Sequence, residues 1–334
     1  MKKEKEGNRF KSKIGGQALI EGIMMRGLGT AAMACRMPSG EIEVETWSIK
    51  TGKNAPWYTK APFIRGCINF FISMKEGIRC TMKSSEKQIT EDDEEEELSK
   101  VEQWLYDKLS AKFGDNFIDK LLPVIMVVTV VITFALSLVV FKGGPVFTAN
   151  LLIKAGMPDT DFSRSVTEGF VRVILITGYM FGISFMPSIK TVFQYHGAEH
   201  KAIACYEARK KLTVQNIAAH PRFHPRCGTS FILLVLILSV IVGLFLPRDN
   251  MWVRFGLQLL FLLPEASIAY EIIKIAGRYD NIITRFISAP GIWLQHITTR
   301  EPTEKQIEVA IAALTPCLPK MKLKTNDKVR YKKL

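Results

Sequence analysis

Two histidines and a glutamate in one pentapeptide are the residues of this chain best suited to catalysis. Residues 196–200 read HGAEH, which fits H-x-x-E-H, the inverted zinc-protease pattern. Residues four apart lie on one face of a helix, so His196 and His200 could both bind one metal ion. Glu199 stands beside them, where a general base acting on water at the metal belongs. The pattern predicts a zinc site with Glu199 as its catalytic residue.

A second motif, FHPRCGTS at residues 223–230, offers further ligands. His224 and Cys227 are spaced H-x-x-C, and both imidazole and thiolate suit zinc. Glu271 competes with them as the third ligand, because a carboxylate downstream is the usual partner of two zinc-binding histidines. The alternative is a structural site, closed by four side chains and leaving no position for water. Its ligands would be His196, His200, His224 and Cys227.

Long apolar runs dominate the middle of the chain. Segments 121–141 and 229–246 contain no charged residue over 21 and 18 positions, which is long enough to cross a hydrocarbon core as a helix. Segments 170–187 and 251–273 are similar, with one and three charged residues. The sequence therefore predicts an α-helical integral membrane protein with about four transmembrane helices. Its membrane domain would span residues 121–273.

Basic residues predict how these spans are oriented. Segment 188–230 holds seven and the chain from 274 onward holds twelve, whereas segment 142–169, expected as the loop between the first two spans, holds three. We therefore expect a multi-pass protein of the plasma membrane with both termini in the cytoplasm. The His/Cys loop, residues 188–230, would then face the cytoplasm at the membrane surface.

Residues 1–90 are predicted to form a small cytoplasmic α+β region. Segment 15–27 has four glycines in thirteen residues, which favours a tight loop or a close backbone approach, and its Glu21 and Arg26 are additional candidates for the site. Segment 31–49 alternates apolar and acidic residues after a Pro-Ser-Gly turn, the pattern of a β-hairpin. Segment 62–84 is an amphipathic helix that would lie on the membrane or pack on the hairpin.

The remaining segments connect and follow the membrane domain. Residues 91–97 read EDDEEEE and are predicted to be an acidic linker, and residues 98–120 an amphipathic helix leading into the first span. Residues 274–334 would form a cytoplasmic C-terminal region. In that region we expect a turn at 290–293, a helix over 302–314 and a basic tail from 320.

Composition narrows the expected partners. The net charge of +13 is explained by basic loops and a basic tail facing the bilayer and its anionic headgroups, so nucleic acid is not an expected partner. Six cysteines show no framework spacing and are expected to remain unpaired. No nucleotide-binding or dinucleotide-binding motif is present, which leaves a metal ion, zinc, as the expected cofactor.

Four segments together resemble the YqhQ-like family of bacterial membrane proteins. They are GGQALIEGIMMR at 15–26, YHGAEHK at 195–201, FHPRCGTS at 223–230, and PGIWLQ with TTREP between 290 and 302. The family is described as predicted metal-dependent enzymes. The resemblance implies a site of His196, Glu199, His200, His224 and Cys227, with Glu21 and Arg26 nearby.

Two functional hypotheses follow. The first is a membrane-embedded zinc hydrolase acting at the cytoplasmic face on peptide, lipid-linked or headgroup substrates. The second is a non-enzymatic membrane protein that binds another membrane protein or a ribosome-associated machine, with a structural metal or none. Glu199 distinguishes the two, because only the first requires it for activity.

Overall fold

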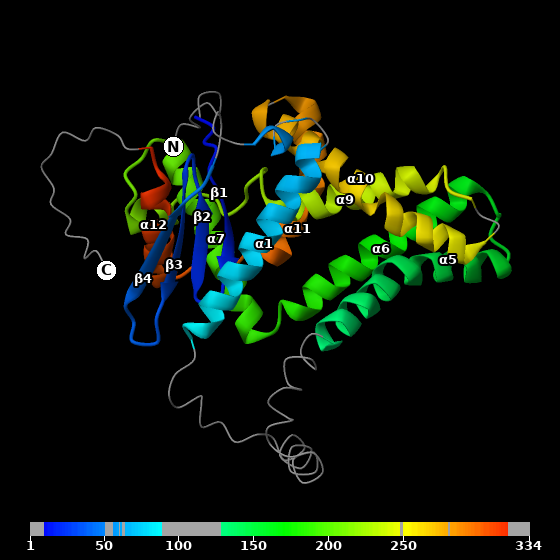
Figure 1. The fold of residues 1–334 in the computed structure, drawn as a ribbon, viewed down its shortest axis with the longest axis horizontal. Helices are drawn as coiled ribbons and strands as arrows, with labels where there is room; N and C mark the ends of the chain where they lie inside the picture. Colours follow the sequence, from blue (N-terminus) through cyan, green and yellow to red (C-terminus); the bar gives the residue numbers. More distant parts are fainter. Residues whose placement is uncertain are drawn as a thin grey trace, which may run out of the picture.

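A small β-sheet lies between helices at one end of the molecule, and long helices extend away from it (Figure 1). The structure is a computed structural model that describes residues 10–50, 56–59, 61, 64–88, 128–247, 250–279 and 281–319. The predicted acidic linker at 91–97, the helix at 98–120, residues 121–127 of the first span and the basic tail lie outside the described residues.

The sheet is a four-stranded antiparallel meander in the order β1-β2-β3-β4. Its strands are β1 (Gly15–Leu19), β2 (Gly22–Arg26), β3 (Thr30–Arg36) and β4 (Ile42–Ser48). The predicted hairpin is confirmed as β3 and β4. Of the two interpretations of the glycine-rich segment, the tight loop is wrong, because the segment forms β1 and β2, whereas the close backbone approach is confirmed. Close packing explains Gly22, since a Cβ there would meet the Cys35 sulfur at 2.6 Å.

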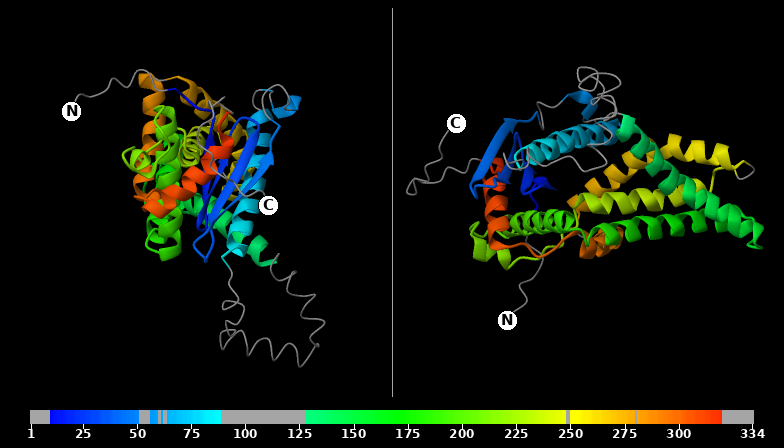
Figure 2. Two further views of the ribbon diagram at one scale, coloured as in Figure 1. Left: turned by 90° about the vertical axis from the view of Figure 1, so that its left-hand side faces the viewer. Right: turned by 90° about the horizontal axis from the view of Figure 1, so that it is seen from below.

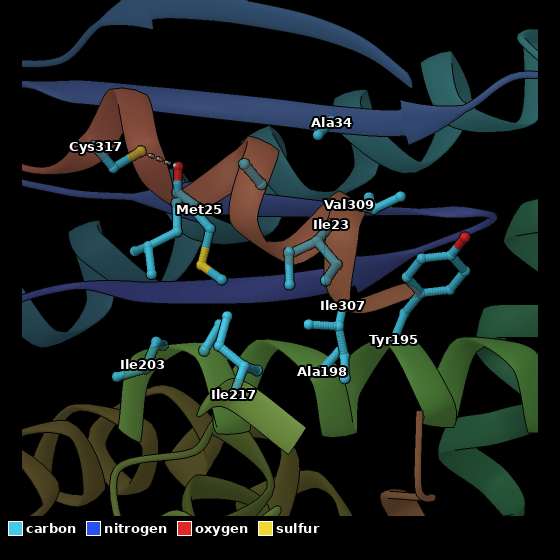
Figure 3. Packing of buried hydrophobic residues seen from close by; sticks show 14 of the residues in the cluster. Ile23, Met25, Ala34, Tyr195, Ala198, Ile203, Ile217, Ile307, Val309 and Cys317 are labelled. Carbon is cyan, nitrogen blue, oxygen red and sulfur yellow. Dashed lines mark hydrogen bonds between the residues drawn. The ribbon is translucent and has the colours of Figure 1, made fainter. Parts of the chain in front are cut away.

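Strand alternation gives the sheet two buried faces. Ile23, Met25 and Ala34 point toward α7 (Pro187–Glu207), α8 (Val214–Ala218), α12 (Glu304–Leu314) and the short helix η5 (Thr315–Cys317), as Figure 3 shows. Met24 and Met33 point the other way, into a cluster with Cys80 of α1 (Ile64–Glu86). The predicted helices at 62–84 and 302–314 are confirmed as α1 and α12, and the Thr303–Gln306 capping box is present.

Four apolar helices extend side by side away from the sheet (Figures 1 and 2). The first runs from Val128 to Lys154, through a π-helical turn, η4 (Val139–Gly143), into α5 (Gly144–Lys154). It is followed by α6 (Asp161–Ile183), α9 (Gly228–Gly243) and α10 (Met251–Arg278). Helix α11 (Ile282–Thr298) packs back against α9, and η3 (Trp57–Thr59) precedes α1.

Two of these helices, Val128–Lys154 and Asp161–Ile183, are long and apolar enough to cross a membrane. Helix α9 is apolar but has 16 residues, and α10 carries Arg254, Glu265 and Glu271 along its 28 residues. By length and composition, the described residues therefore support membrane association through two helices.

Two sequence expectations about connections are wrong. Residues 142–154 and 161–169 are helical rather than loop, because the apolar run continues past Lys142, whose side chain is itself buried. The expected turn at 290–293 lies inside α11. Gly291 is required there by a close crossing of α11 over α9, since a Cβ would come within 2.1 Å of the Ser230 hydroxyl.

A buried charged network joins α6, α9 and α10. Arg254 is 0% exposed and donates to the Glu168 carboxylate at 2.6 Å, and the Gln258 amide donates to the same carboxylate at 2.6 Å. Arg172 donates to Ser239 and to Gln258. Ionisable groups among apolar helices are costly unless they are paired, so this network specifies how the three helices pack.

Breaking the network should destabilise the bundle strongly. Arg254→Met removes the closer of the two cations beside the Glu168 carboxylate and leaves Arg172 at 3.7 Å, and we expect a cost of about 3–5 kcal/mol. The matched control is Asp159→Asn, which removes the partner of Arg164 at 3.1 Å, where Asp159 is half exposed and about 1 kcal/mol or less is expected. Thermal unfolding of both variants in one detergent measures the two losses of stability. Equal losses would contradict a role of the network in holding the three helices together.

Candidate metal site

Helix α7 presents His196, Glu199 and His200 at the junction of the sheet and the long helices. The predicted helix over this motif is confirmed, and Pro187 at its start suits a first helical turn. Gly197, between the histidine and the glutamate, lies against the chain that follows α11. A Cβ at Gly197 would come within 2.0 Å of the Arg300 carbonyl oxygen, so only glycine allows the two segments to approach.

Backbone carbonyls hold both imidazoles in one orientation. The His196 Nδ1 lies 2.8 Å from the Thr298 carbonyl oxygen, and the His200 Nδ1 lies 2.6 Å from that of Arg222. A carbonyl can only accept, so each Nδ1 carries a proton and each Nε2 is left facing the site. Histidines that bind a metal are oriented in this way by their outer partners.

Cys227 completes a group of three side chains suited to a metal. It is the N-cap of α9, and its sulfur lies 3.1 Å from the His196 Nε2. The ligand atoms of His196, His200 and Cys227 all lie within 4.8 Å of one another. In a tetrahedral zinc site, bonds of about 2.0–2.3 Å place the ligand atoms about 3.5 Å apart, so small side-chain adjustments would suffice.

Electrostatics favours the thiolate form of Cys227. Burial would raise the pKa of its thiol, but the neighbouring His196 and His200 hold that pKa well below its usual value. In return, although burial opposes it, the thiolate raises the pKa of His196 to about 9. Thiolate is the form of cysteine that binds metals and attacks electrophiles, so this environment suits Cys227 to either role.

Glu199 lies beside the same group, against the backbone of β1. It is buried, and burial raises the pKa of its carboxyl, while the two histidines oppose this rise. A Cβ added to Gly16 would come within 3.0 Å of the Glu199 carboxyl group. The bare backbone of Gly16 therefore makes the space that this carboxyl occupies, and β1 becomes part of the site.

His224 lies next to the group but faces elsewhere. Its ring centroid is 5.6 Å from that of His200, and its Nε2 is 3.8 Å from a Glu207 carboxylate oxygen. Gln295 fixes the loop by donating to the His224 carbonyl and accepting from its N–H, both at 2.8 Å. The structure thus brings His196, His200 and Cys227 together and places His224 in an outer layer.

Glu207 anchors this outer layer. Its carboxylate accepts from the Ser12 N–H at 2.7 Å and from the Arg226 guanidinium, which ties the N-terminal segment and the His/Cys loop to the end of α7. Burial would raise the pKa of Glu207, but His224, Arg226 and Ser12 outweigh it and lower the pKa to about 2. Glu207 lies seven residues along α7 from His200, about 10 Å along the helix axis, so it does not join the ligand group.

Acid should therefore loosen the His/Cys loop. The pKa of Glu207 is lower in the folded chain than its ordinary value of 4.5, so its contribution of about 3 kcal/mol is present above pH 4.5 and is lost as pH falls toward 2. Glu207→Gln should weaken this acid sensitivity of unfolding. Exposed Glu304→Gln is the control, and parallel pH profiles for the two variants would contradict the prediction.

The three additional candidates lie outside the ligand group. Glu271 forms an ion pair with Arg65 of α1, at 2.6 Å from the Arg65 Nε, so the structure does not bring it to the histidines. Glu21 occupies the β1–β2 turn with φ 47° and accepts from the Tyr195 hydroxyl at 2.9 Å. Arg26, at the end of β2, lines a cleft between the sheet and α1.

Sequence reasoning missed the residues that hold the site from outside. The carbonyls of Thr298 and Arg222 are backbone groups that every residue carries, and the Gln295 amide is not a metal ligand type, so residue types gave no signal for them. The TTREP segment offered a signal only through its family resemblance. The glycines of segment 15–27 suggested a close backbone approach, but not that a buried carboxyl, Glu199, would lie against Gly16.

The fold and site together define a helical protein with membrane-type helices and a His/Cys group at their base. The chain belongs to the family described as "Protein of unknown function (DUF1385)", whose model matches residues 61–320. It is 33% identical over 305 residues to "Uncharacterized protein YqhQ" of Bacillus subtilis (strain 168), covering 91% of this chain and 92% of that protein. The resemblance to the YqhQ-like family is thus confirmed. No solved structure matches the chain significantly.

Proposed function

We propose that this protein is a zinc-dependent hydrolase of the membrane. The observation that carries the proposal is the convergence of two carbonyl-oriented imidazoles and one thiolate, with a buried carboxyl beside them. Three protein ligands with one open position are the usual composition of a catalytic zinc site. His196, His200 and Cys227 hold the metal, and Glu199 is the general base.

Zinc held by these three residues would supply a Lewis acid and lower the pKa of a bound water to roughly 7. The role of Glu199 would be to accept one proton from the attacking water as its oxygen bonds to the electrophilic atom of the substrate. Glu199 would then pass this proton to the leaving group, so that one water is consumed for each bond broken. The buried position of Glu199 keeps bulk water from competing for this transfer.

The membrane placement rests on four helices rather than two. Besides the two long apolar helices, α9 and α10 extend in the same direction, and the C-terminal end of α9 and the N-terminal end of α10 lie at the far end from the sheet (Figure 1). Basic segments lie at the sheet end, which favours a cytoplasmic sheet and cytoplasmic termini. The site would then lie at the cytoplasmic surface of the membrane.

A thiol-dependent reaction is the second candidate, favoured by the 3.1 Å contact between the His196 Nε2 and the Cys227 sulfur. A Cys–His pair at a helix N-terminus is a common nucleophile. However, one imidazole suffices for such a pair. The second imidazole, His200, is turned to the same sulfur and held by its own carbonyl partner, which supports a metal over a dyad.

Metal analysis of the purified protein tests the proposal directly. After chelator-free purification in detergent, we expect about one zinc per chain by mass spectrometry of the metal, the stoichiometry of a single tetrahedral site. If the zinc content were clearly substoichiometric and thiol-directed inhibitors still blocked activity, the zinc hydrolase would be excluded. The Cys–His pair would then be the reactive group. A full zinc complement without any activity would favour the non-enzymatic hypothesis.

A further inference from the structure

A cleft lies between the sheet and α1. Its volume is about 710 Å³, within the range of small-molecule sites. The N-terminal half of β1 and the end of β2 form one side, and Asn69 and Ser73 of α1 form part of the other. The cross-strand pair of Gln17 and Met24 faces α1 and lines the cleft, whereas the next pair, Gly16 and Met25, turns toward α7, where Glu199 lies. The cleft and Glu199 therefore lie on opposite faces of the sheet.

The cleft is positively charged. Lys13, Arg26 and Lys50 line it, and Glu76 is its one acidic residue. Glu76 already pairs with Arg79 at 3.6 Å. Across the described residues, no carboxylate lies within ion-pair distance of the three cations. Three unpaired cations around one cavity favour an anionic ligand.

Helix α1, which forms one wall of the cleft, is exposed on its outer side. Helix α1 crosses the direction of the long helices (Figure 1) and is joined to α10, where a Cβ on Gly66 would meet Ser267 at 2.8 Å. Its outer side exposes apolar side chains, with basic residues among them. The apolar ones are Ile64, Phe71, Met74, Ile78 and Met82. This is the composition of a helix that lies in the membrane–water interface.

We propose that the cleft binds the phosphate-bearing headgroup of an anionic membrane lipid. This binding is independent of the proposed hydrolysis, because the cleft and Glu199 lie on opposite faces of the sheet. The lipid chains would remain in the bilayer along α1, while Arg26, Lys13 and Lys50 hold the phosphate.

Lipid retention by the full-length protein tests this inference. The protein in neutral detergent is titrated with phosphatidylglycerol, with phosphatidylcholine or with soluble glycerol phosphate, and the bound molecules are counted by native mass spectrometry. We expect phosphatidylglycerol to bind, and Arg26→Glu and Lys50→Glu each to weaken it about tenfold or more, because each replaces a phosphate-binding cation by an anion. Lys305→Glu on α12 makes the same charge change outside the cleft and should bind as the wild type does.

Each result of this titration either supports or overturns the proposed headgroup site. Equal binding of phosphatidylcholine, or equal losses in Lys305→Glu, would overturn the headgroup site. Glycerol phosphate binding as tightly as the lipid would identify a soluble phosphate compound instead of a lipid. His200→Ala separates this inference from the proposed function. If that variant loses zinc but keeps the lipid, the cleft binds independently of the metal. If the lipid binds to a wild type that contains no zinc, only the hydrolase proposal fails.

Discussion

Glu199→Gln is expected to abolish hydrolysis while leaving zinc bound. The amide keeps the shape of the carboxyl beside Gly16 but cannot take a proton from water, so the rate should fall by about 10²–10⁴-fold, the usual contribution of a general base. His196, His200 and Cys227 are untouched, so the metal content should equal that of the wild type. Turnover of a panel of phospholipid, ester and peptide substrates is measured at matched zinc occupancy.

Glu304→Gln is the control for this experiment, because Glu304 is an exposed carboxylate at the start of α12 that should affect neither zinc nor rate. Loss of zinc together with activity in Glu199→Gln would make Glu199 a ligand rather than a base. Unchanged turnover in Glu199→Gln would exclude it from the chemistry and leave the Cys–His pair as the reactive group.

The sequence could predict the pieces of the site that lie on one element. Spacing alone placed His196, Glu199 and His200 together, because a helix fixes the geometry of residues four apart. Pro225 and Gly228 likewise predict a non-helical approach to the apolar run at 229–246, where Cys227 becomes the N-cap of α9. Local rules were sufficient wherever the contacts are local.

The rest depends on contacts between distant segments. Whether His224 or Cys227 turns toward the histidines is decided by Gln295, 71 residues along the chain, and by Glu207 at the end of α7. The same is true of the glycine-rich segment. Gly16 and Gly22 suggest a loop on local grounds, but they accommodate Glu199 and Cys35, which only the folded sheet brings near. These two glycines allow close packing within strands rather than forming a turn.

The four apolar runs illustrate the same limit for the long helices. Hydropathy located an apolar helix at each of the four, but it ended the first too early, at 141, because Lys142 looks like a boundary. In the fold, Lys142 lies 3.7 Å from Glu265 of α10, and the helix continues to Lys154. A charge that finds a partner on another helix does not end an apolar helix.

Zinc content should separate the three proposed ligands from His224. His200→Ala and Cys227→Ser each remove one of three ligand atoms and should lose most of the bound zinc, whereas His224→Gln removes an outer residue and should keep it. Losing an outer-layer residue typically weakens metal binding about 10–100-fold, so His224→Gln should show a lower affinity without losing its site.

Cobalt substitution makes this comparison spectroscopic. A thiolate bound to cobalt gives a sulfur-to-metal charge-transfer band, which should be present in the wild type and in His224→Gln and absent in Cys227→Ser. If His224→Gln lost zinc as completely as His200→Ala, four side chains would close the metal site. Water would then have no position at the metal, and the second hypothesis, a structural metal in a non-enzymatic membrane protein, would follow. The orientation of His224 toward Glu207, with Gln295 holding its backbone, favours the open site.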